Sequence, residues 1–238
     1  MRSLKGLQVI DACLSCKLRE GRLFCDLPEE QLKELDAIKF SSVYPRGAML
    51  FIEGESPRGV FVLCRARVKL MTCSTDGKTM MRIAAPGEVI GLSATISGKP
   101  YEATAEMLDT GQINFIRTED FLRYLRQHAD VCLRIAQHLS NDYQAANDQA
   151  RSLGLSSSAS EKLARLILGW CDETGEMTEQ GIRLKFSFTH EEIAQMISAT
   201  RETVTRLLGD FRHSDVILLR GSSLIIRDRV ALESMLTA

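Results

Sequence analysis

Three cysteines stand close together near the start of the chain, at Cys13, Cys16 and Cys25. Two thiolates close in sequence and a third on a nearby loop suit an iron–sulfur cluster, which proteins hold through cysteine sulfur. The same donors leave open a structural zinc ion, a thiol redox switch or no cofactor. Seven cysteines, an odd number, and no readable export signal argue against a disulfide framework and favour reduced thiols.

A second group of side chains, toward the C-terminal end, has the chemistry needed to read DNA. Arg201, Glu202, Thr205 and Arg206 lie in the first turns of an expected helix. Arginine can hydrogen-bond guanine at two atoms, and glutamate can accept from a cytosine amine. An ordinary solvent-exposed helix can have a similar charged composition. The neighbouring elements must therefore decide between a DNA-reading helix and a surface helix.

Those elements form a predicted helix-turn-helix from Thr189 to Phe211. The run Thr189-His190-Glu191-Glu192 is a capping box, Ser198-Ala199 is a turn, and Thr200 caps the second helix. The residues expected to be buried are Ile193, Ala194 and Ile197 in the first helix and Val204, Leu207, Leu208 and Phe211 in the second. Val216 to Arg220 and Ser223 to Arg227 then predict a β-hairpin wing.

The first half of the chain predicts antiparallel strands in a barrel or roll. Between Val43 and Ile116, short apolar runs alternate with turn signals, and Asp76-Gly77 is the clearest hairpin. A short amphipathic helix is expected before them, over Pro28 to Ala37, with Leu32 and Leu35 inward.

A long helix follows the strands. Its small and apolar residues recur at alternating spacings of four and three, typical of a coiled-coil seam between two copies of the chain: Cys132, Ala136, Leu139, Tyr143, Ala146, Ala150 and Leu153. Packing on its own domain is the alternative. Gly154 and the serines after it predict a hinge. The expected domains are 1–127, a sensor, 128–155, the dimerisation helix and hinge, and 156–238, the DNA-binding domain.

Composition is that of a globular protein, with 45% hydrophobic and 26% charged residues. The apolar runs are shorter than the ~18 residues of a membrane span. Because no export signal is readable either, a cytoplasmic location is expected. The net charge is −1, from 30 basic and 31 acidic residues, so a DNA-binding surface must be a local patch.

The stretches Thr189 to Gln195 and Arg201 to Leu208 strongly resemble the CRP/FNR family of bacterial regulators. The resemblance covers nearly the whole chain, including Gly47, Gly54, Gly77, Gly87 and Gly91 of the roll. It implies an α+β fold: an N-terminal antiparallel β-roll like a cyclic-nucleotide-binding domain, a long dimerisation helix and a C-terminal winged helix-turn-helix. It also implies a homodimer on palindromic double-stranded DNA that works with RNA polymerase.

By this resemblance, Arg201, Glu202 and Arg206 read bases, Thr205 supports them, and Thr189 contacts a phosphate. Two residues depart from the family pattern. Ser198 and Ala66 stand where the family commonly has glycine, so each is expected to carry a Cβ at a positive φ, at a cost of up to about 1 kcal/mol.

The sensor differs from that of the cyclic-nucleotide branch. Those members carry a glutamate shortly after a roll glycine and then an arginine for the phosphate, whereas here Gly91 is followed by Leu92 and Ser93, and Glu102 replaces the arginine. A carboxylate there would repel a phosphate, so cyclic AMP is not the expected ligand.

Cys13, Cys16 and Cys25 are instead similar to the cysteine cluster of the oxygen-sensing FNR branch. That branch has a fourth cysteine at the end of the roll, where this sequence has Asn114. Cys64, Cys73 or the carboxylate of Asp26 could replace it. Cys132 and Cys171 are expected to be core fillers.

The favoured function is therefore a DNA-binding regulator that responds to oxygen or redox state through an iron–sulfur cluster. A regulator gated by an unknown small molecule in the roll is the alternative. An enzyme has little support, because Glu102, Glu106 and Asp109 come without a nucleophile, a phosphate loop or a metal triad.

Overall fold

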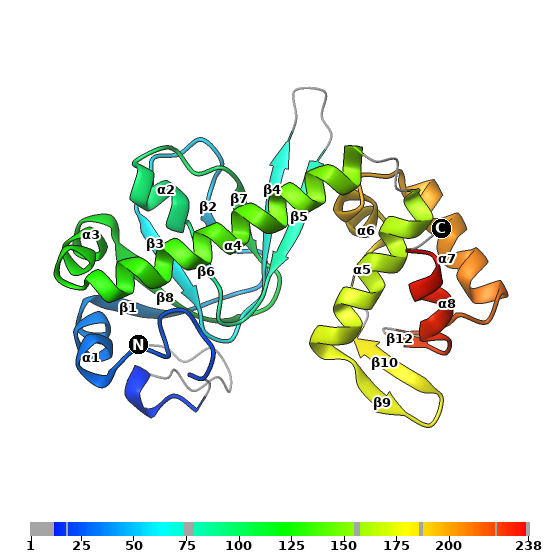
Figure 1. Ribbon diagram of the computed structural model, residues 1–238, viewed down its shortest axis with the longest axis horizontal. Helices are drawn as coiled ribbons and strands as arrows, with labels where there is room; N and C mark the ends of the chain where they lie inside the picture. The colour runs from blue at the N-terminus through cyan, green and yellow to red at the C-terminus, as the bar shows by residue number, and fades with distance from the viewer. Residues whose placement is uncertain are drawn as a thin grey trace. The chain divides into compact units, whose positions relative to one another are not determined.

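The computed structural model describes residues 12–238, except 18, 74–78, 155–157, 186–187, 222 and 237–238. The chain divides into two compact units. The first comprises Met1–Thr72 with Met81–Asn147, and the second Cys73–Met80 with Asp148–Ala238. Each is described by itself (Figure 1).

The first unit is a β-roll of two four-stranded sheets, in the orders β1-β8-β3-β6 and β2-β7-β4-β5. The strands are β1 Lys39–Tyr44, β2 Met49–Phe51, β3 Gly59–Leu63, β4 Val68–Cys73, β5 Thr79–Ala84, β6 Val89–Ile90, β7 Thr104–Met107 and β8 Gly111–Arg117. The predicted antiparallel roll is confirmed. Strands β4 and β5 are neighbours as expected, but the Asp76-Gly77 turn and Gly77 lie outside the described residues.

Two glycines show why the roll needs this residue. Gly59 runs beside β8, and a Cβ on it would lie 2.0 Å from the carbonyl oxygen of Ile116. Gly91 has φ 76° and precedes helix α2, Leu92–Ser97; a Cβ there would lie 2.9 Å from the Tyr101 ring. Any larger residue would force the strand or the aromatic ring to move.

One core joins the N-terminal segment to the helices. A short 3₁₀ turn, Cys13–Ser15, precedes α1, Glu29–Ile38, and α3 covers Thr118–Gln127. The core contains Phe24, Cys25, Leu27, Leu32, Leu35, Phe121, Tyr124, Val131 and Ile135 among others. The inward positions of Leu32 and Leu35 are confirmed. The rings of Phe24 and Phe121 meet edge to face at 5.6 Å.

Helix α4, Ala129–Gly154, runs along the roll (Figure 1). Val131 and Ile135 are buried in the core just described, and Leu139 packs partly against it. The adjacent face carries the predicted seam, where Tyr143 is 68% exposed. Cys132, Ala136 and Ala146 are exposed too, while the side chains of Ala150 and Leu153 lie outside the described set. The first part of α4 therefore packs on its own roll and also leaves the seam accessible.

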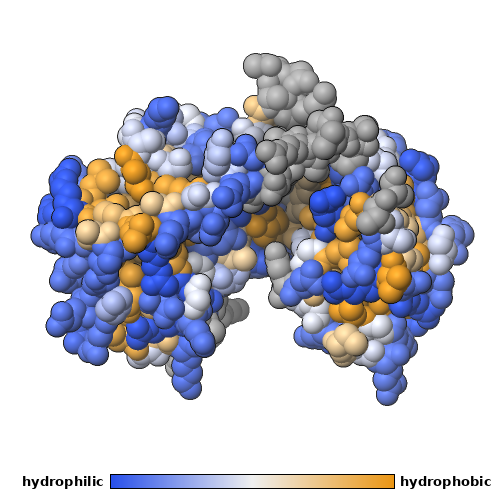
Figure 2. Space-filling model, viewed as in Figure 1, coloured by the Kyte–Doolittle hydropathy of each residue, from blue (hydrophilic) through white to orange (hydrophobic). Residues whose placement is uncertain are grey.

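The visible surface over α2 and the neighbouring part of α4 shows hydrophobic residues among hydrophilic ones (Figure 2). Ile96 of α2 is 40% exposed and Leu133 of α4 is 63% exposed. Leu133 lies outside the predicted seam, so the hydrophobic surface of α4 is wider than the heptad pattern predicts.

The described part of the second unit includes helices α5 to α8 and a sheet of order β11-β12-β10-β9. Its elements are α5 Ala159–Thr174, β9 Glu176–Thr178, β10 Gly181–Lys185, α6 His190–Met196, α7 Arg201–His213, β11 Ile217–Arg220, β12 Ser223–Ile226 and α8 Arg229–Ser234. The hydroxyl of Ser158 caps α5 by accepting from the backbone N–H of Glu161 at 3.1 Å. Trp170 of α5 stacks on Phe188 at 4.9 Å.

The two expected positive-φ residues behave differently. Ser198 has φ 53°, as predicted for the turn between α6 and α7. The prediction for Ala66 is wrong, since the positive-φ residues other than glycine in the described chain are Ser198 and Asp215. Ala66 is instead a buried core residue. Its methyl group packs against Gly111, where an added Cβ would lie only 2.7 Å from the Ala66 Cβ.

Candidate DNA-binding interface and sensor sites

The helix-turn-helix begins with the predicted capping box. The backbone N–H of Glu192 donates to the hydroxyl of Thr189 at 3.2 Å, and the backbone N–H of Thr189 donates to the Glu192 carboxylate at 2.9 Å. These two bonds satisfy backbone donors that the first turn of α6 leaves unpaired. Thr189 itself remains exposed, so the start of α6 is fixed and accessible.

The second helix is fixed in the same way. The backbone N–H of Thr203 donates to the hydroxyl of Thr200 at 3.2 Å, as the sequence predicts. All seven residues expected to be buried in α6 and α7 are buried: Ile193, Ala194, Ile197, Val204, Leu207, Leu208 and Phe211. The position of α7 is therefore set by core packing and leaves its outer face available.

That outer face carries the three predicted base readers and the supporting threonine. Arg201, Glu202, Thr205 and Arg206 are all exposed on α7. Backbone N–H bonding at the helix start, with help from Thr200, lowers the pKa of Glu202 below its ordinary value and keeps it an anionic acceptor. The two arginines as donors and Glu202 as an acceptor thus face solvent on one short helix, as direct base reading requires.

His190 is a functional candidate that the sequence reasoning missed. Its Nδ1 lies 2.8 Å from the hydroxyl of Thr205, which also donates to the carbonyl of Arg201 at 2.9 Å. His190 therefore connects the start of α6 to the reading face of α7. The separation of fifteen residues gave no local signal for this contact.

The predicted wing is confirmed. Strands β11 and β12 pair antiparallel, with Arg220 opposite Ser223, and Gly221 between them has φ 55°. Arg220 is exposed at the end of β11. Basic wing residues suit contact with the DNA backbone.

The N-terminal cysteines pack against the roll. Cys25 is 9% exposed, and burial raises its pKa. Burial, with a hydrogen bond to Asp36, raises the pKa of Cys13 to about 12. The Asn114 side-chain amide of β8 donates to the Cys13 sulfur at 3.7 Å. Asn114 therefore does lie beside the cysteines, but it brings an amide instead of a thiol.

The candidates for a fourth ligand have different surroundings. Cys73 is exposed at the end of β4, and Asp26 pairs with Arg134 at 3.5 Å. Cys64 is half-buried, and burial raises its pKa to about 12, with smaller contributions from Cys25 and Cys16. Within the described part of the chain, no three His, Cys, Asp or Glu side chains stand close enough to hold one metal ion.

The two cysteines expected to be core fillers differ. Cys171 is buried in the core of the second unit, as predicted. Cys132 is exposed on the predicted seam of α4, where its thiol donates to the carbonyl of Leu125 at 3.1 Å, so its place as a filler between two copies stays a prediction. Its neighbours Val131 and Ile135 take the core positions instead.

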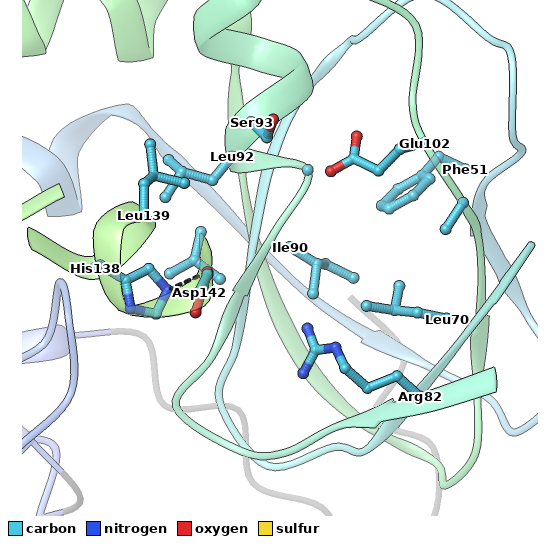
Figure 3. Close-up of a pocket in the computed structure, with 13 residues that line it drawn as sticks. Phe51, Leu70, Arg82, Ile90, Leu92, Ser93, Glu102, His138, Leu139 and Asp142 are labelled. Atoms are coloured by element: carbon cyan, nitrogen blue, oxygen red, sulfur yellow. Dashed lines mark ion pairs between the residues drawn. The ribbon is translucent and has the colours of Figure 1, made fainter. Parts of the chain in front are cut away.

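A cavity of about 110 Å³ lies between the roll and α4. Arg82 and Glu102 flank an apolar surface formed by Leu70 and Ile90, while His138 of α4 pairs with Asp142 at 3.5 Å (Figure 3). Ser93, Leu92 and Gly91 also line it. The predicted replacement of a phosphate-binding arginine by Glu102 thus places a carboxylate at this cavity.

Comparison with known proteins decides the family. Residues 42–128 match the cyclic nucleotide-binding domain, and residues 161–235 match the Crp-like helix-turn-helix domain. The chain belongs to the CRP/FNR family of transcription regulators. As a CRP/FNR regulator it is a DNA-binding protein, and the relatives described next regulate transcription and are not enzymes.

A CRP-like cAMP-activated global transcriptional regulator of Mycobacterium tuberculosis is 24% identical over 197 residues, 82% of this chain and 86% of that protein. An anaerobic regulatory protein of Bacillus subtilis is 24% identical over 204 residues, 84% of this chain and 85% of that protein. The solved structure of FixK2 from Bradyrhizobium japonicum is similar to this chain, with a TM-score of 0.72 and 18% identity. The similarity covers 83% of this chain and 97% of that one and supports the fold.

A search of the described residues finds no helix both long and apolar enough to span a membrane.

Proposed function

We propose that this CRP/FNR regulator responds to oxygen or redox state through an iron–sulfur cluster held by Cys13, Cys16 and Cys25. It acts as a homodimer on palindromic DNA and works with RNA polymerase. One observation carries the proposal: the cysteine segment shares a core with α4, in which Cys25 and Phe24 pack together with Val131 and Ile135. A change at the cysteines therefore acts on the helix that bears the predicted dimer seam.

The hydrogen bond at the Cys13 sulfur supports a redox role for this segment. A cluster supplies a redox centre that loses integrity or changes charge on oxidation. The amide of Asn114, already bonded to the Cys13 sulfur, tunes a redox centre as hydrogen bonds to cluster sulfur do. The anaerobic regulatory protein among the relatives agrees with this signal.

A small-molecule effector is a second candidate, favoured by the cavity beside α4. Its volume of about 110 Å³ is well below the roughly 300–1,000 Å³ of pockets for drug-sized ligands. Arg82 provides a cation and Glu102 an anion at its edge. An effector here would be smaller than a nucleotide and would act directly on His138 of α4.

The test compares full-length protein purified without oxygen and then exposed to air. We expect visible absorption typical of an iron–sulfur cluster, lost in air together with tight binding to specific DNA. A matched sample of Cys16→Ser should be colourless and bind DNA weakly in both conditions. Colourless wild-type protein whose DNA binding is indifferent to air would reject the redox proposal and favour the small-molecule candidate.

A further inference from the structure

The hydroxyl group of Thr205 has two hydrogen-bond partners. It donates to the backbone carbonyl of Arg201, one turn earlier in α7, at 2.9 Å. The same oxygen lies 2.8 Å from Nδ1 of His190, the first residue of α6. Because a hydroxyl carries a single hydrogen, the ring nitrogen of His190 is the donor in the second bond. One bond thus stays within α7, and the other ties α7 to α6.

These two bonds decide which part of Thr205 is free to meet DNA. Its hydroxyl hydrogen is already used, and its oxygen is held between the preceding turn of α7 and the His190 ring. A threonine β-carbon carries a methyl group beside the hydroxyl. Thr205 is exposed, so its methyl group is the part of the side chain that remains available.

The surroundings of that methyl group are charged. Thr205 follows Arg201 by four residues and Glu202 by three, so it lies beside both on the helix surface. Arg206 is the next residue, and all of these side chains are exposed. An apolar group among polar base readers suits thymine, whose C5-methyl group is the apolar feature that base pairs present in the major groove.

We propose that His190 is a positioning residue that holds the Thr205 hydroxyl away from the bases, so that the Thr205 methyl group reads the C5-methyl group of one thymine in each half-site. The two half-sites rest on the proposed function. The contact itself is independent of redox sensing, since both residues lie in the DNA-binding unit.

The test uses the full-length protein, with or without air as its DNA binding requires, and a site selected from random DNA. Each thymine is replaced in turn by deoxyuridine, which keeps the hydrogen-bonding edge and lacks only the methyl group. At one thymine per half-site, wild-type binding should weaken about fourfold, the effect of burying one methyl group less. Thr205→Val should keep this discrimination, and Thr205→Ser should lose it.

Variants of His190 test the positioning role. His190→Ala frees the hydroxyl, so discrimination between thymine and deoxyuridine should fall toward that of Thr205→Ser. His190→Asn should restore it, because its amide can donate from near the position of Nδ1. The matched control is His213→Ala: this exposed histidine of α7 donates from Nδ1 to the Gly209 carbonyl at 2.7 Å, and its loss should leave the discrimination unchanged.

Wild-type protein that binds every deoxyuridine site as tightly as the thymine site would overturn the methyl contact, as would full discrimination by Thr205→Ser. Loss of specific binding by Thr205→Val would assign the reading to the hydroxyl. Equal weakening of specific and random DNA binding by His190→Ala would identify a phosphate contact instead of a positioning residue. A protein that selects no palindromic site would reject the proposed function itself. Since Thr205 is exposed, its variants decide the methyl contact even if His190→Ala does not fold.

Discussion

Arg206 lies on the exposed face of α7, where it forms an ion pair with Asp210 at 3.4 Å. Both side chains are more than half exposed, at 66% and 59%. Exposed pairs of this kind contribute at most about 1 kcal/mol, so releasing the guanidinium to a base costs little. The residue is therefore available for DNA although it has a partner in the free protein.

Replacing Arg206 with alanine should weaken specific DNA binding by roughly 1–3 kcal/mol, the size of one bidentate base contact. Weaker, salt-sensitive binding to random DNA should stay largely unchanged. Titrations of both DNAs over a range of salt concentrations measure the two effects. Arg212→Ala, in the exposed last turn of the same helix, is the control. Equal losses on both DNAs would identify Arg206 as a phosphate contact.

Thr189 has a structural role as well as an expected DNA contact. Thr189→Ala removes the hydroxyl that accepts from Glu192 and should lower the free energy of unfolding by about 0.5–2 kcal/mol. Thr189→Ser keeps an acceptor and should stay near wild type. Urea unfolding can be followed by Trp170, the single tryptophan of the chain, which packs in this unit. An unchanged midpoint for the alanine variant would mean that the capping box is dispensable.

Periodicity and capping predict most of the fold. Both helices of the reading head, their caps, their buried residues and the wing follow local rules that neighbouring residues obey. Contacts between distant segments could not be predicted in this way. The link from His190 to Thr205 and the hydrogen bond from Asn114 to the Cys13 sulfur depend on tertiary packing. Ala66 was misjudged because its small side chain fits beside Gly111.

Helix α4 gives a prediction about the predicted dimer. Its seam carries small side chains such as Ala136 and Ala146, which bury little area, so a modest bias can shift dimerisation. Ala146→Leu should strengthen the dimer and make DNA binding less dependent on oxygen. Sedimentation with and without air, beside DNA titrations, measures both. Gln144→Leu, an exposed position away from the seam, should have no such effect.

A dimer that is insensitive to air would assign the switch to another element. If the wild-type protein stays a tight dimer in air and still loses DNA, dimerisation is not the switched step. The hinge near Gly154 would then be the better candidate, because it joins α4 to the DNA-binding unit.

The net charge of −1 gives the protein little general attraction to DNA. Affinity is therefore expected to come from α7 and the wing, which the proposed two-fold dimer would present to DNA twice. Selection from random DNA should therefore yield palindromes with half-sites resembling TTGAT or TGTGA, centred about one helical turn apart. Enrichment of asymmetric sites alone would contradict a symmetric dimer.

Because the cysteine segment shares a core with α4, the two cannot be exchanged independently of each other. Phe24 and Cys25 cover the same apolar surface as Val131 and Ile135, so the segment before Pro28 is not a detachable module. A chimera that exchanges residues 1–28 alone would set a foreign surface against an unchanged α4 and leave part of that core unfilled. A chimera that keeps this core intact should therefore carry the roll and α4 through Leu139 as one piece.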